Sequence, residues 1–365
     1  MTANQFISFP LASLFQKFEI QLAMAFLCSR CPSIPGRIFQ RCFENNESSI
    51  EFLRSHVVLP LSVVCPLCGN NCVYRKDRHQ WRCHSSFVIP RTKKRRWCNY
   101  CVSDFHGTFL EGTHLQAWQI VCFVYYWVQK QFVHDIALRN LQISYHTSVD
   151  WRSFCSEVCD YWFKNQEPIG GKDIVVEIDE TLLVRRKYNR GRELVQTWLF
   201  GGIERVAKKK FVVPLVDGEG NILRRDRATL VPLIKKYIHP GSVIISDGWT
   251  AYASLKEEGY VHYSVNHSKN FVAPEDHAIH TQNIERLWRD IKEWVKKPGI
   301  RSKYLNQYLA RYLFVKEAGD QEVHFFLQQA AKLYPPIRGR TAPRIEAPPI
   351  PHTDDFDCDP DDPPE

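Results

Sequence analysis

Three acidic residues of this chain have the types and spacing that metal-dependent phosphodiester chemistry requires. Asp179 and Asp247 each end a short apolar run, and Glu285 lies in the helix-like segment from His280 to Lys292. Carboxylates on neighbouring strand ends, joined by a third from a helix packed on the sheet, can hold two divalent ions. These residues therefore predict a metal-dependent site that acts on nucleic acid.

The apolar runs around these acids predict a mixed α/β sheet that would position them. Three strands in succession, with a turn-forming segment at Asp217–Gly220, predict an antiparallel meander. An amphipathic helix and a fourth, buried strand come next. The predicted elements are strands at 174–181, 197–203, 211–216 and 242–246, and a helix at 230–238. This β-β-β-α-β order, with acids ending the first and fourth strands, is the ribonuclease-H-like layout, in which those two strands are neighbours.

Side-chain direction divides the other polar residues near the acids. Glu177 shares the face of Asp179 and can assist it, whereas Glu180 points to the opposite face. On the helix, Asn283 is the alternative third ligand, but two residues separate it from Glu285, so the two side chains point in different directions.

Several other residues of the helical segment are candidates for contact with nucleic acid. We favour Glu285 as the third ligand, with Lys292 on the same helix face able to meet a phosphate. Arg289 is a further phosphate contact, and His280 can orient water or DNA or serve in structural hydrogen bonding.

Six of the thirteen cysteines lie in Cys-x-x-Cys pairs, which favours metal binding in a reducing compartment over a disulfide framework. Cys65 and Cys68 form one pair, and Cys98 and Cys101 form another. Two such pairs complete a tetrahedral structural zinc site. Cys83 is the alternative third ligand.

Charge favours a polyanionic partner. The formal net charge is +8, and it would become +15 without the seven acidic residues of the segment 352–365. The basic run Lys93, Lys94, Arg95 and Arg96 can grip phosphates or act as a nuclear import signal; a solvated loop is the structural alternative.

The middle of the chain is helical. The stretch 115–129 is apolar nearly all round, as in a buried helix. Helices at 133–141 and 146–162, with Ser144 or Thr147 as the N-cap, have the outline of a helix-turn-helix that could present Arg139 and Arg152 to DNA. Ordinary helical packing explains the same pattern equally well.

These patterns predict five segments. They are a leader of unknown role (1–44), a zinc-binding cysteine module (45–112), a helical helix-turn-helix region (113–168), a ribonuclease-H-like catalytic domain (169–333) and a disordered Pro/Asp-rich tail (334–365). We expect no segment to span a bilayer.

Four motifs together resemble Merlin-type DDE transposases and their bacterial insertion-sequence relatives. They are Glu177–Thr181, Ser246–Tyr252, Val265–Val272 and His280–Lys292, of which the last is the most specific. The resemblance covers roughly residues 48 to 316. The segment between Cys83 and Cys98 is longer than in the family.

The resemblance implies a cut-and-paste DNA transposase that binds terminal inverted repeats, cleaves the ends and joins the 3′-OH to target DNA. It implies two Mg²⁺ or Mn²⁺ ions at Asp179, Asp247 and Glu285, a structural Zn²⁺ ion, and a homodimer or higher synaptic assembly on double-stranded DNA. The expected location is the nucleus in a eukaryote and the cytoplasm otherwise. The alternatives are a host-recruited DNA-binding protein without cleavage and a structure-selective nuclease.

Overall fold

The computed structural model describes most of the chain, including every site residue named above. The described stretches are 45–88, 93–129, 133–183, 197–217, 221–265, 280–296 and 304–336. The predicted leader, residues 266–272 of the third motif and the tail beyond residue 336 lie outside them. The chain divides into two compact units, one of Val124–Val323 and one of Met1–Phe123 with His324–Glu365. The predicted segment limits near 112, 168 and 333 remain predictions.

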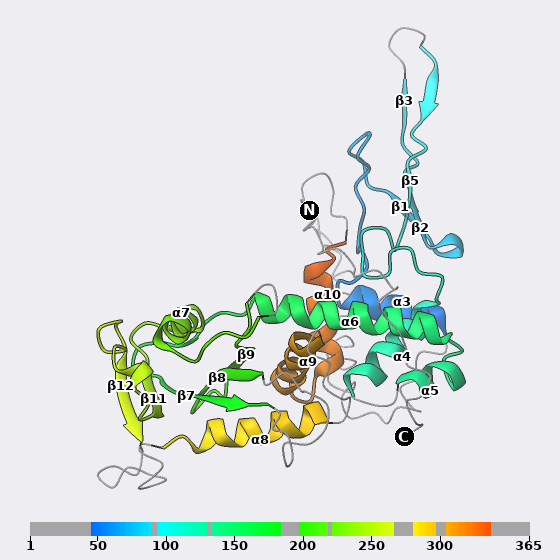
Figure 1. The fold of residues 1–365 in the computed structure, drawn as a ribbon. Helices are drawn as coiled ribbons and strands as arrows, with labels where there is room; N and C mark the ends of the chain where they lie inside the picture. Colours follow the sequence, from blue (N-terminus) through cyan, green and yellow to red (C-terminus); the bar gives the residue numbers. More distant parts are fainter. Residues whose placement is uncertain are drawn as a thin grey trace, which may run out of the picture. The chain divides into compact units, whose positions relative to one another are not determined.

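The first unit contains short strands that follow one helix. Its described elements up to the first boundary are α3 (Asn46–Ser55), β1 (Val73–Arg75), a 3₁₀ turn (Lys76–Arg78), β2 (Gln80–Arg82), β3 (Ser86–Val88), β4 (Arg95–Trp97), β5 (Cys101–Ser103) and the first part of α4 (Ala117–Val128). Strands β1, β2 and β5 form an antiparallel sheet in the order β1-β2-β5, and β3 pairs only with β4 (Figure 1).

A buried carboxylate ties α3 to the three-stranded sheet. The Asn45 side chain caps α3 by accepting from the Glu47 backbone N–H. At the other end of the helix, Arg54 donates to Asp104, whose second oxygen accepts from the Trp81 indole at 2.7 Å. Because the Asp104 side chain is fully buried, these two donors compensate the cost of removing its charge from water.

The second unit contains a five-stranded sheet and the helices around it. Its described elements are the last part of α4, α5 (Val133–Arg139), α6 (Tyr145–Lys164), β6 (Ile169–Gly170), β7 (Val175–Leu182), β8 (Trp198–Glu204), β9 (Lys210–Pro214), α7 (Arg227–Tyr237), β10 (Ile238–His239), β11 (Val243–Asp247), a 3₁₀ turn (Thr250–Tyr252), β12 (Val261–Val265), α8 (Gln282–Lys296), α9 (Leu305–Ala318) and the start of α10 (Glu322–Leu333).

The large sheet is mixed, with strand order β12-β11-β7-β8-β9. Strands β7, β8 and β9 form the predicted antiparallel meander, while β11 runs parallel to β7 and β12 parallel to β11. The prediction that the first and fourth strands are neighbours is therefore confirmed. With eight α-helices among the described residues, the fold is mixed α/β, as predicted.

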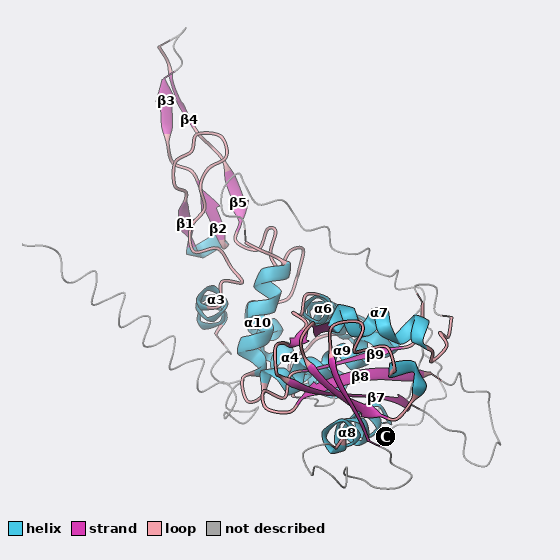
Figure 2. Ribbon diagram, turned by 90° about the vertical axis from the view of Figure 1, so that its left-hand side faces the viewer, coloured by secondary structure: helices cyan, strands magenta, loops and turns pink. Residues whose placement is uncertain are grey.

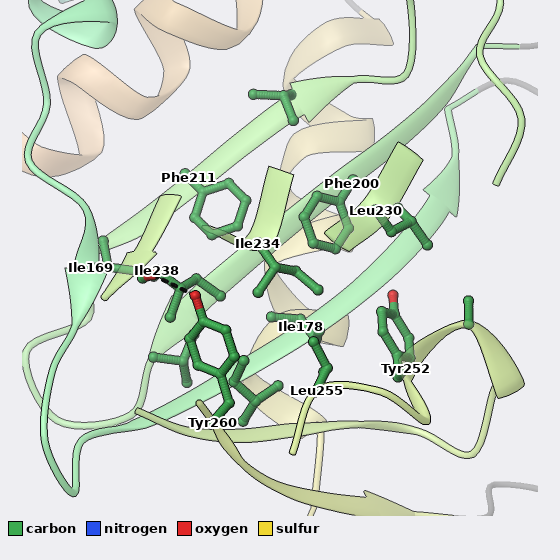
Figure 3. Close-up of a cluster of buried hydrophobic side chains, with 14 of the residues drawn as sticks. Ile169, Ile178, Phe200, Phe211, Leu230, Ile234, Ile238, Tyr252, Leu255 and Tyr260 are labelled. Carbon is green, nitrogen blue, oxygen red and sulfur yellow. Dashed lines mark hydrogen bonds between the residues drawn. The ribbon is translucent and has the colours of Figure 1, made fainter. Parts of the chain in front are cut away.

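The two faces of this sheet carry different side chains because residues alternate along each strand. Ile178 and Phe200 point into the main hydrophobic core, where Leu230 and Ile234 of α7 meet them (Figure 3). The opposite face of β7 and β8 packs against α8, which runs below β7 in Figure 1 and is seen nearly end-on in Figure 2. The acidic residues of β7 are thus divided between an apolar core and the face that α8 covers.

The predicted helices of the middle region are confirmed, and α6 is a packed helix. Ser144, one of the two predicted N-cap candidates, caps it by accepting from the Thr147 backbone N–H at 3.2 Å. Its buried side packs on α9, where the rings of Trp162 and Phe314 meet edge to face at 5.3 Å. Among the described residues, no helix has the length and apolar character needed to cross a membrane.

Candidate functional site

Asp179 and Asp247 lie on adjacent parallel strands at the same level. The register pairs Ile245 with Glu177, and each strand continues two residues further, to Asp247 in β11 and Asp179 in β7. Both side chains are half-buried. Residues paired across parallel strands share a face, so this edge of the sheet brings the first two predicted metal ligands together.

Each of these carboxylates accepts one hydrogen bond from a tryptophan. The Trp288 indole N–H of α8 donates to Asp179 Oδ2 at 2.9 Å, and the backbone N–H of Trp249 donates to Asp247 Oδ1 at 3.3 Å. Gly201 faces Asp179 across the β7–β8 pair, and a Cβ atom added there would lie 2.6 Å from the Trp288 ring. The glycine therefore gives the indole room to reach the carboxylate.

Glu177 anchors the start of α8 to the sheet. Its buried carboxylate accepts from the backbone N–H groups of Asn283 at 2.9 Å and Ile284 at 3.1 Å. A negative charge at a helix N-terminus satisfies N–H groups that lack a partner within the helix and complements the helix dipole. The prediction that Glu177 shares the face of Asp179 is thus consistent with its contact with α8.

Arg205 completes this anchor. It donates to Glu177 Oε1 at 2.8 Å and to the His280 carbonyl at 2.6 Å. Nothing in the local pattern around Arg205 signals this role, because its partners lie 28 and 75 residues away in the sequence. At the other end of the contact, Lys292 donates to Thr181 at 2.7 Å, so α8 is fixed along β7 at both ends.

Glu285 is an exposed residue of α8, and it lines a pocket beside the helix. The pocket has a volume of about 570 Å³ and is lined by Glu285, Trp288, Arg289, Lys292 and Glu293. The spacing of three and four residues places the first four on one helix face. The structure therefore brings Glu285 together with Lys292, as the sequence predicted, and with the indole that contacts Asp179.

The alternative third ligand, Asn283, is engaged at both ends of its amide. Its Nδ2 donates to Glu177 Oε1 at 2.7 Å, and its Oδ1 accepts from Lys208 at 3.0 Å. His280 lies beside the same carboxylate, with Nδ1 3.6 Å from Glu177 Oε1. Both residues therefore belong to the α8 anchor in this structure. Within the described stretches, the three predicted carboxylates do not form a metal-sized group like that of the cysteines.

Glu180 is a buried acid on the other face of β7. Tyr252 donates a hydrogen bond to it from the core side. Burial, together with the nearby charges of Asp179 and Asp247, raises the pKa of Glu180 to about 8, although the Tyr252 hydrogen bond opposes this rise. This confirms that Glu180 points away from Asp179, and it marks a concentration of negative charge at these strand ends.

The Arg225 guanidinium makes cation–π contacts with two tryptophan rings close to the same strand ends. The Arg225 guanidinium carbon is 3.6 Å from the centre of the Trp198 ring and 4.6 Å from that of Trp249. Its positive charge lowers the pKa of Glu180 against the larger effect of burial. The sequence analysis missed Arg225, since only folding brings it beside the two tryptophans.

In the first unit, four cysteines converge on one point. Their sulfur atoms all lie within 4.8 Å of one another, and the four are Cys65, Cys68, Cys83 and Cys98. The Cys65–Cys98 and Cys68–Cys83 sulfur pairs are 3.5 and 3.4 Å apart. Tetrahedral zinc with Zn–S bonds of about 2.3 Å needs sulfur atoms roughly 3.8 Å apart, so this cluster has the size of a zinc site.

The cluster contains Cys83, the alternative ligand, and not the preferred Cys101. Cys101 pairs with Arg82 across β2 and β5, while the Cys83 backbone N–H donates to the carbonyl of Tyr100. Successive residues of a strand face opposite ways, so the Cys101 side chain points away from Cys83. Cys101 is exposed, and its thiol contacts the Gln80 side chain.

The turn after Cys65 prepares the first pair of thiols. The Gly69 backbone N–H donates to the Cys65 carbonyl at 2.9 Å, and Gly69 has φ = +74°, which glycine adopts readily. A hydrogen bond from the Asn70 backbone lowers the pKa of Cys68 to about 6. The thiolate form, which binds metal, is thereby favoured near neutral pH.

The predicted DNA-contacting residues differ in their surroundings. Arg139, Arg289 and the run from Lys93 to Arg96 are exposed. Arg152 is half-buried, and its guanidinium lies 2.8 Å from His134 Nε2, so it supports the packing of α5 against α6.

Comparison with known proteins finds a transposase-like segment in the part of the chain that contains the acidic site. Residues 169–316 match the family model described as the ISXO2-like transposase domain. This segment resembles a DDE transposase domain. The transposase-like segment includes β7, β11 and α8 and therefore all three predicted carboxylates. The match supports transposase function in general and, with it, a DNA partner.

Two curated proteins are similar to longer or shorter parts of the chain. Male abnormal protein mab-31 of Caenorhabditis elegans is 25% identical over 326 residues, which are 82% of this chain and 71% of that protein. An uncharacterized transposase-like protein of Haemophilus influenzae is 30% identical over 83 residues, 22% of this chain. The second match spans 65% of the bacterial protein.

Proposed function

We propose that this chain is a Merlin-type DDE transposase that cleaves transposon ends and joins the 3′-OH to target DNA. The observation that carries the proposal is that Asp247 and Asp179 each lie two residues beyond the paired Ile245 and Glu177 on neighbouring parallel strands, inside a transposase-like segment. The strand order β12-β11-β7-β8-β9, with an antiparallel meander at one end and two parallel strands at the other, supports the ribonuclease-H-like assignment.

The donor set suits hard divalent cations. Asp179, Asp247 and Glu285 offer carboxylate oxygens, the ligands that Mg²⁺ and Mn²⁺ prefer. Two such ions would activate the attacking oxygen and stabilise the leaving one. The Trp288 indole N–H donates to Asp179 Oδ2 and so orients this carboxylate at the strand end. Lys292 and Arg289 border the same pocket and would neutralise the phosphates of a bound DNA end.

The cysteine cluster suits a structural zinc ion. Four sulfur ligands form a closed tetrahedral set, which leaves no open position for a substrate. Cys65, Cys68, Cys83 and Cys98 would hold the ion, which would stabilise a unit whose strands have only three residues each. The ligand set that we propose therefore replaces Cys101 with Cys83.

The expected partners are terminal inverted repeats and target DNA, both double-stranded. Joining two ends requires two active sites, so we expect a homodimer or larger assembly on DNA. In a eukaryote, the enzyme would act in the nucleus. The Arg139 end of α5 and the exposed start of α6 are the part of the proposed helix-turn-helix that could reach DNA.

Conservative substitutions of the three carboxylates test the proposal. Asp179→Asn, Asp247→Asn and Glu285→Gln should each lower Mg²⁺-dependent nicking of end-containing DNA by about 100-fold or more, because even residues behind metal ligands contribute 10–100-fold. DNA affinity, measured by fluorescence anisotropy, should persist. Glu257→Gln is the matched control, because Glu257 is an exposed carboxylate of the same unit with side-chain exposure of 80%.

Cleavage at the wild-type rate in all three variants would refute the proposal. Cleavage lost only in the Asp179 and Asp247 variants would remove Glu285 as the third ligand and return attention to Asn283. Mg²⁺-dependent cleavage that is indifferent to the end sequence would instead favour a structure-selective nuclease.

A second candidate is a host-recruited DNA-binding protein that no longer cuts. The hydrogen bond from Trp288 to Asp179 favours it, because the bond engages one oxygen of a predicted metal ligand. Sequence-specific DNA binding by the wild-type chain, without nicking in Mg²⁺ or Mn²⁺, would support this candidate. Metal-dependent nicking would exclude it.

A further inference from the structure

In the sequence, the hairpin formed by β3 and β4 lies between Cys83 and Cys98, two of the four members of the cysteine cluster. The chain departs after Cys83 and returns at Cys98. The Cys98 backbone N–H donates to the Ser85 carbonyl at 2.7 Å, so the pairing of β3 with β4 begins beside the cluster. In Figures 1 and 2 the hairpin extends from the β1-β2-β5 sheet on the side away from α3.

Such a hairpin depends on its base for stability. Two strands of three residues are marginal in water unless something else fixes them. The cluster at the base supplies that constraint, because a metal that joins Cys83 to Cys98 also fixes the start of β3 relative to the end of β4. The shape of the hairpin should therefore depend on metal binding.

The charge of the hairpin is of one sign. The segment from His84 to Trp97 contains five Lys or Arg residues and no Asp or Glu. Lys93, Lys94, Arg95 and Arg96 are all exposed. Closely spaced, exposed cations repel one another, so binding to a polyanion stabilises this segment.

One face of the hairpin combines this charge with exposed apolar groups. The register pairs Val88 with Arg95 and Ser86 with Trp97, which puts these four side chains on one face and Arg96 on the other. Val88 and Trp97 are 52% and 60% exposed. A guanidinium beside apolar groups can recognise bases in the major groove. The guanidinium donates to the acceptors of guanine, and the apolar groups contact the methyl group of thymine.

We propose that the β3–β4 hairpin is an arm that enters the major groove of double-stranded DNA and is held in shape by the metal-bound cysteine cluster. The face of Val88, Arg95 and Trp97 meets the base edges, and Lys94 and Arg96 contact the flanking phosphates. A two-stranded ribbon fits a B-form major groove about 12 Å wide. The inference rests on the proposed function for its DNA partner, and it adds the element that binds and the role of the metal.

The test measures DNA binding separately from cleavage. We would use the full-length, zinc-loaded chain with Asp179→Asn and follow its anisotropy titration on a 30-base-pair duplex at several salt concentrations. The double substitution Lys94→Ala/Arg96→Ala should weaken binding at least about 10-fold and lower the salt slope by roughly 1.8, since each phosphate contact contributes about 0.9.

The matched control removes the same charge from the same unit. Lys76 and Arg78 lie on the 3₁₀ turn before β2, with side-chain exposures of 72% and 65%. Lys76→Ala/Arg78→Ala should change affinity less than about 2-fold. Trp97→Ala should weaken binding about 10-fold with an unchanged salt slope, because an apolar contact releases no counterions.

Metal removal and duplex RNA complete the test. A zinc chelator should weaken DNA binding of the parent as much as the Lys94/Arg96 substitution does, and should add little to that variant, since both would act through the hairpin. Duplex RNA has a major groove too deep and narrow to be read, so the Trp97 variant should bind it like the parent.

Equal losses from the Lys94/Arg96 and Lys76/Arg78 pairs, or no effect of Trp97→Ala, would overturn the groove-binding arm. Fully additive effects of chelation and Lys94/Arg96 substitution would overturn the role of the metal. None of these results depends on strand cleavage, so failure of the proposed enzymatic function would appear separately, as a wild-type chain that binds DNA without nicking it.

Discussion

At the scale of single residues, Glu180 is a buried acid that lies next to the predicted metal ligand Asp179 in β7. It is held in the core face of β7 by Tyr252 while its sequence neighbour Asp179 faces α8. Its raised pKa means that the folded protein binds a proton that the unfolded chain releases. Two adjacent acids of one strand therefore lie in different surroundings, Glu180 on the core side and Asp179 on the side of α8.

This difference predicts a dependence of stability on pH. The pKa of Glu180 is about 8 in the fold and 4.5 in the reference state, so its contribution is fully present below pH 4.5 and is lost as the pH rises to 8. We expect the free energy of unfolding in urea, without added Mg²⁺, to fall less between pH 5 and 8.5 in Glu180→Gln than in the wild type. Parallel curves for the two proteins would contradict the prediction.

At the scale of elements, α8 is the helix that brings the third carboxylate to the sheet. Its first turn is held by Glu177, and a later turn is held through the contact of Lys292 with Thr181. The angle and height of α8 therefore depend on residues that need not touch a metal. The proposed role of Glu285 as a metal ligand would depend on that anchor.

Removal of the anchor should destabilise the second unit. Glu177→Ala would leave the largely buried Arg205 without its carboxylate and the first N–H groups of α8 without an acceptor. We expect a loss of about 3 kcal/mol in the free energy of unfolding, measured with urea. Glu257→Ala, which removes an exposed carboxylate, should change it by less than about 0.5 kcal/mol. A similar small change in both variants would show that Glu177 does not anchor α8.

The elements around the site could be predicted because their signals are local. The apolar runs before Asp179 and Asp247 predicted adjacent strands, and the spacing from Glu285 to Lys292 predicted one helix face. The fourth member of the cysteine cluster could not be chosen in this way. The Cys98-x-x-Cys101 pattern resembles a ligand pair, but a strand that begins at Cys101 turns that thiol outward.

Long-range contacts account for the rest of what the sequence left open. The bond between Trp288 and Asp179 joins residues 109 apart, and the contact of Glu177 with Asn283 joins residues 106 apart. Neither leaves a periodic pattern near its own position, so only the folded chain reveals that Asn283 supports the helix.

At the scale of the whole molecule, charge is distributed unevenly along the chain. The last fourteen residues contain seven acids and no Lys or Arg, against a net charge of +8 for the whole sequence. An acidic segment on a basic chain competes with DNA for the same Lys and Arg side chains. Its effect should be general and independent of DNA sequence.

Deletion of residues 352–365 should therefore strengthen non-specific DNA binding. We expect a higher affinity for random duplex at about 0.05 M salt, with the difference from the full chain fading as salt shortens the screening length. A variant with the same length, in which the seven acids become Asn or Gln, should match the deletion. An affinity gain in the deletion alone would assign the effect to chain length and not to charge.

The β3–β4 hairpin has a consequence for how this chain could vary. Because both strands start from the same cysteine cluster, residues can be added to the hairpin without moving a thiol. Two residues inserted in each strand would lengthen the hairpin by about 7 Å and return Trp97 to the same face. One residue in each strand would turn that face around. The module can thus change its reach in two-residue steps while its cysteine cluster stays the same.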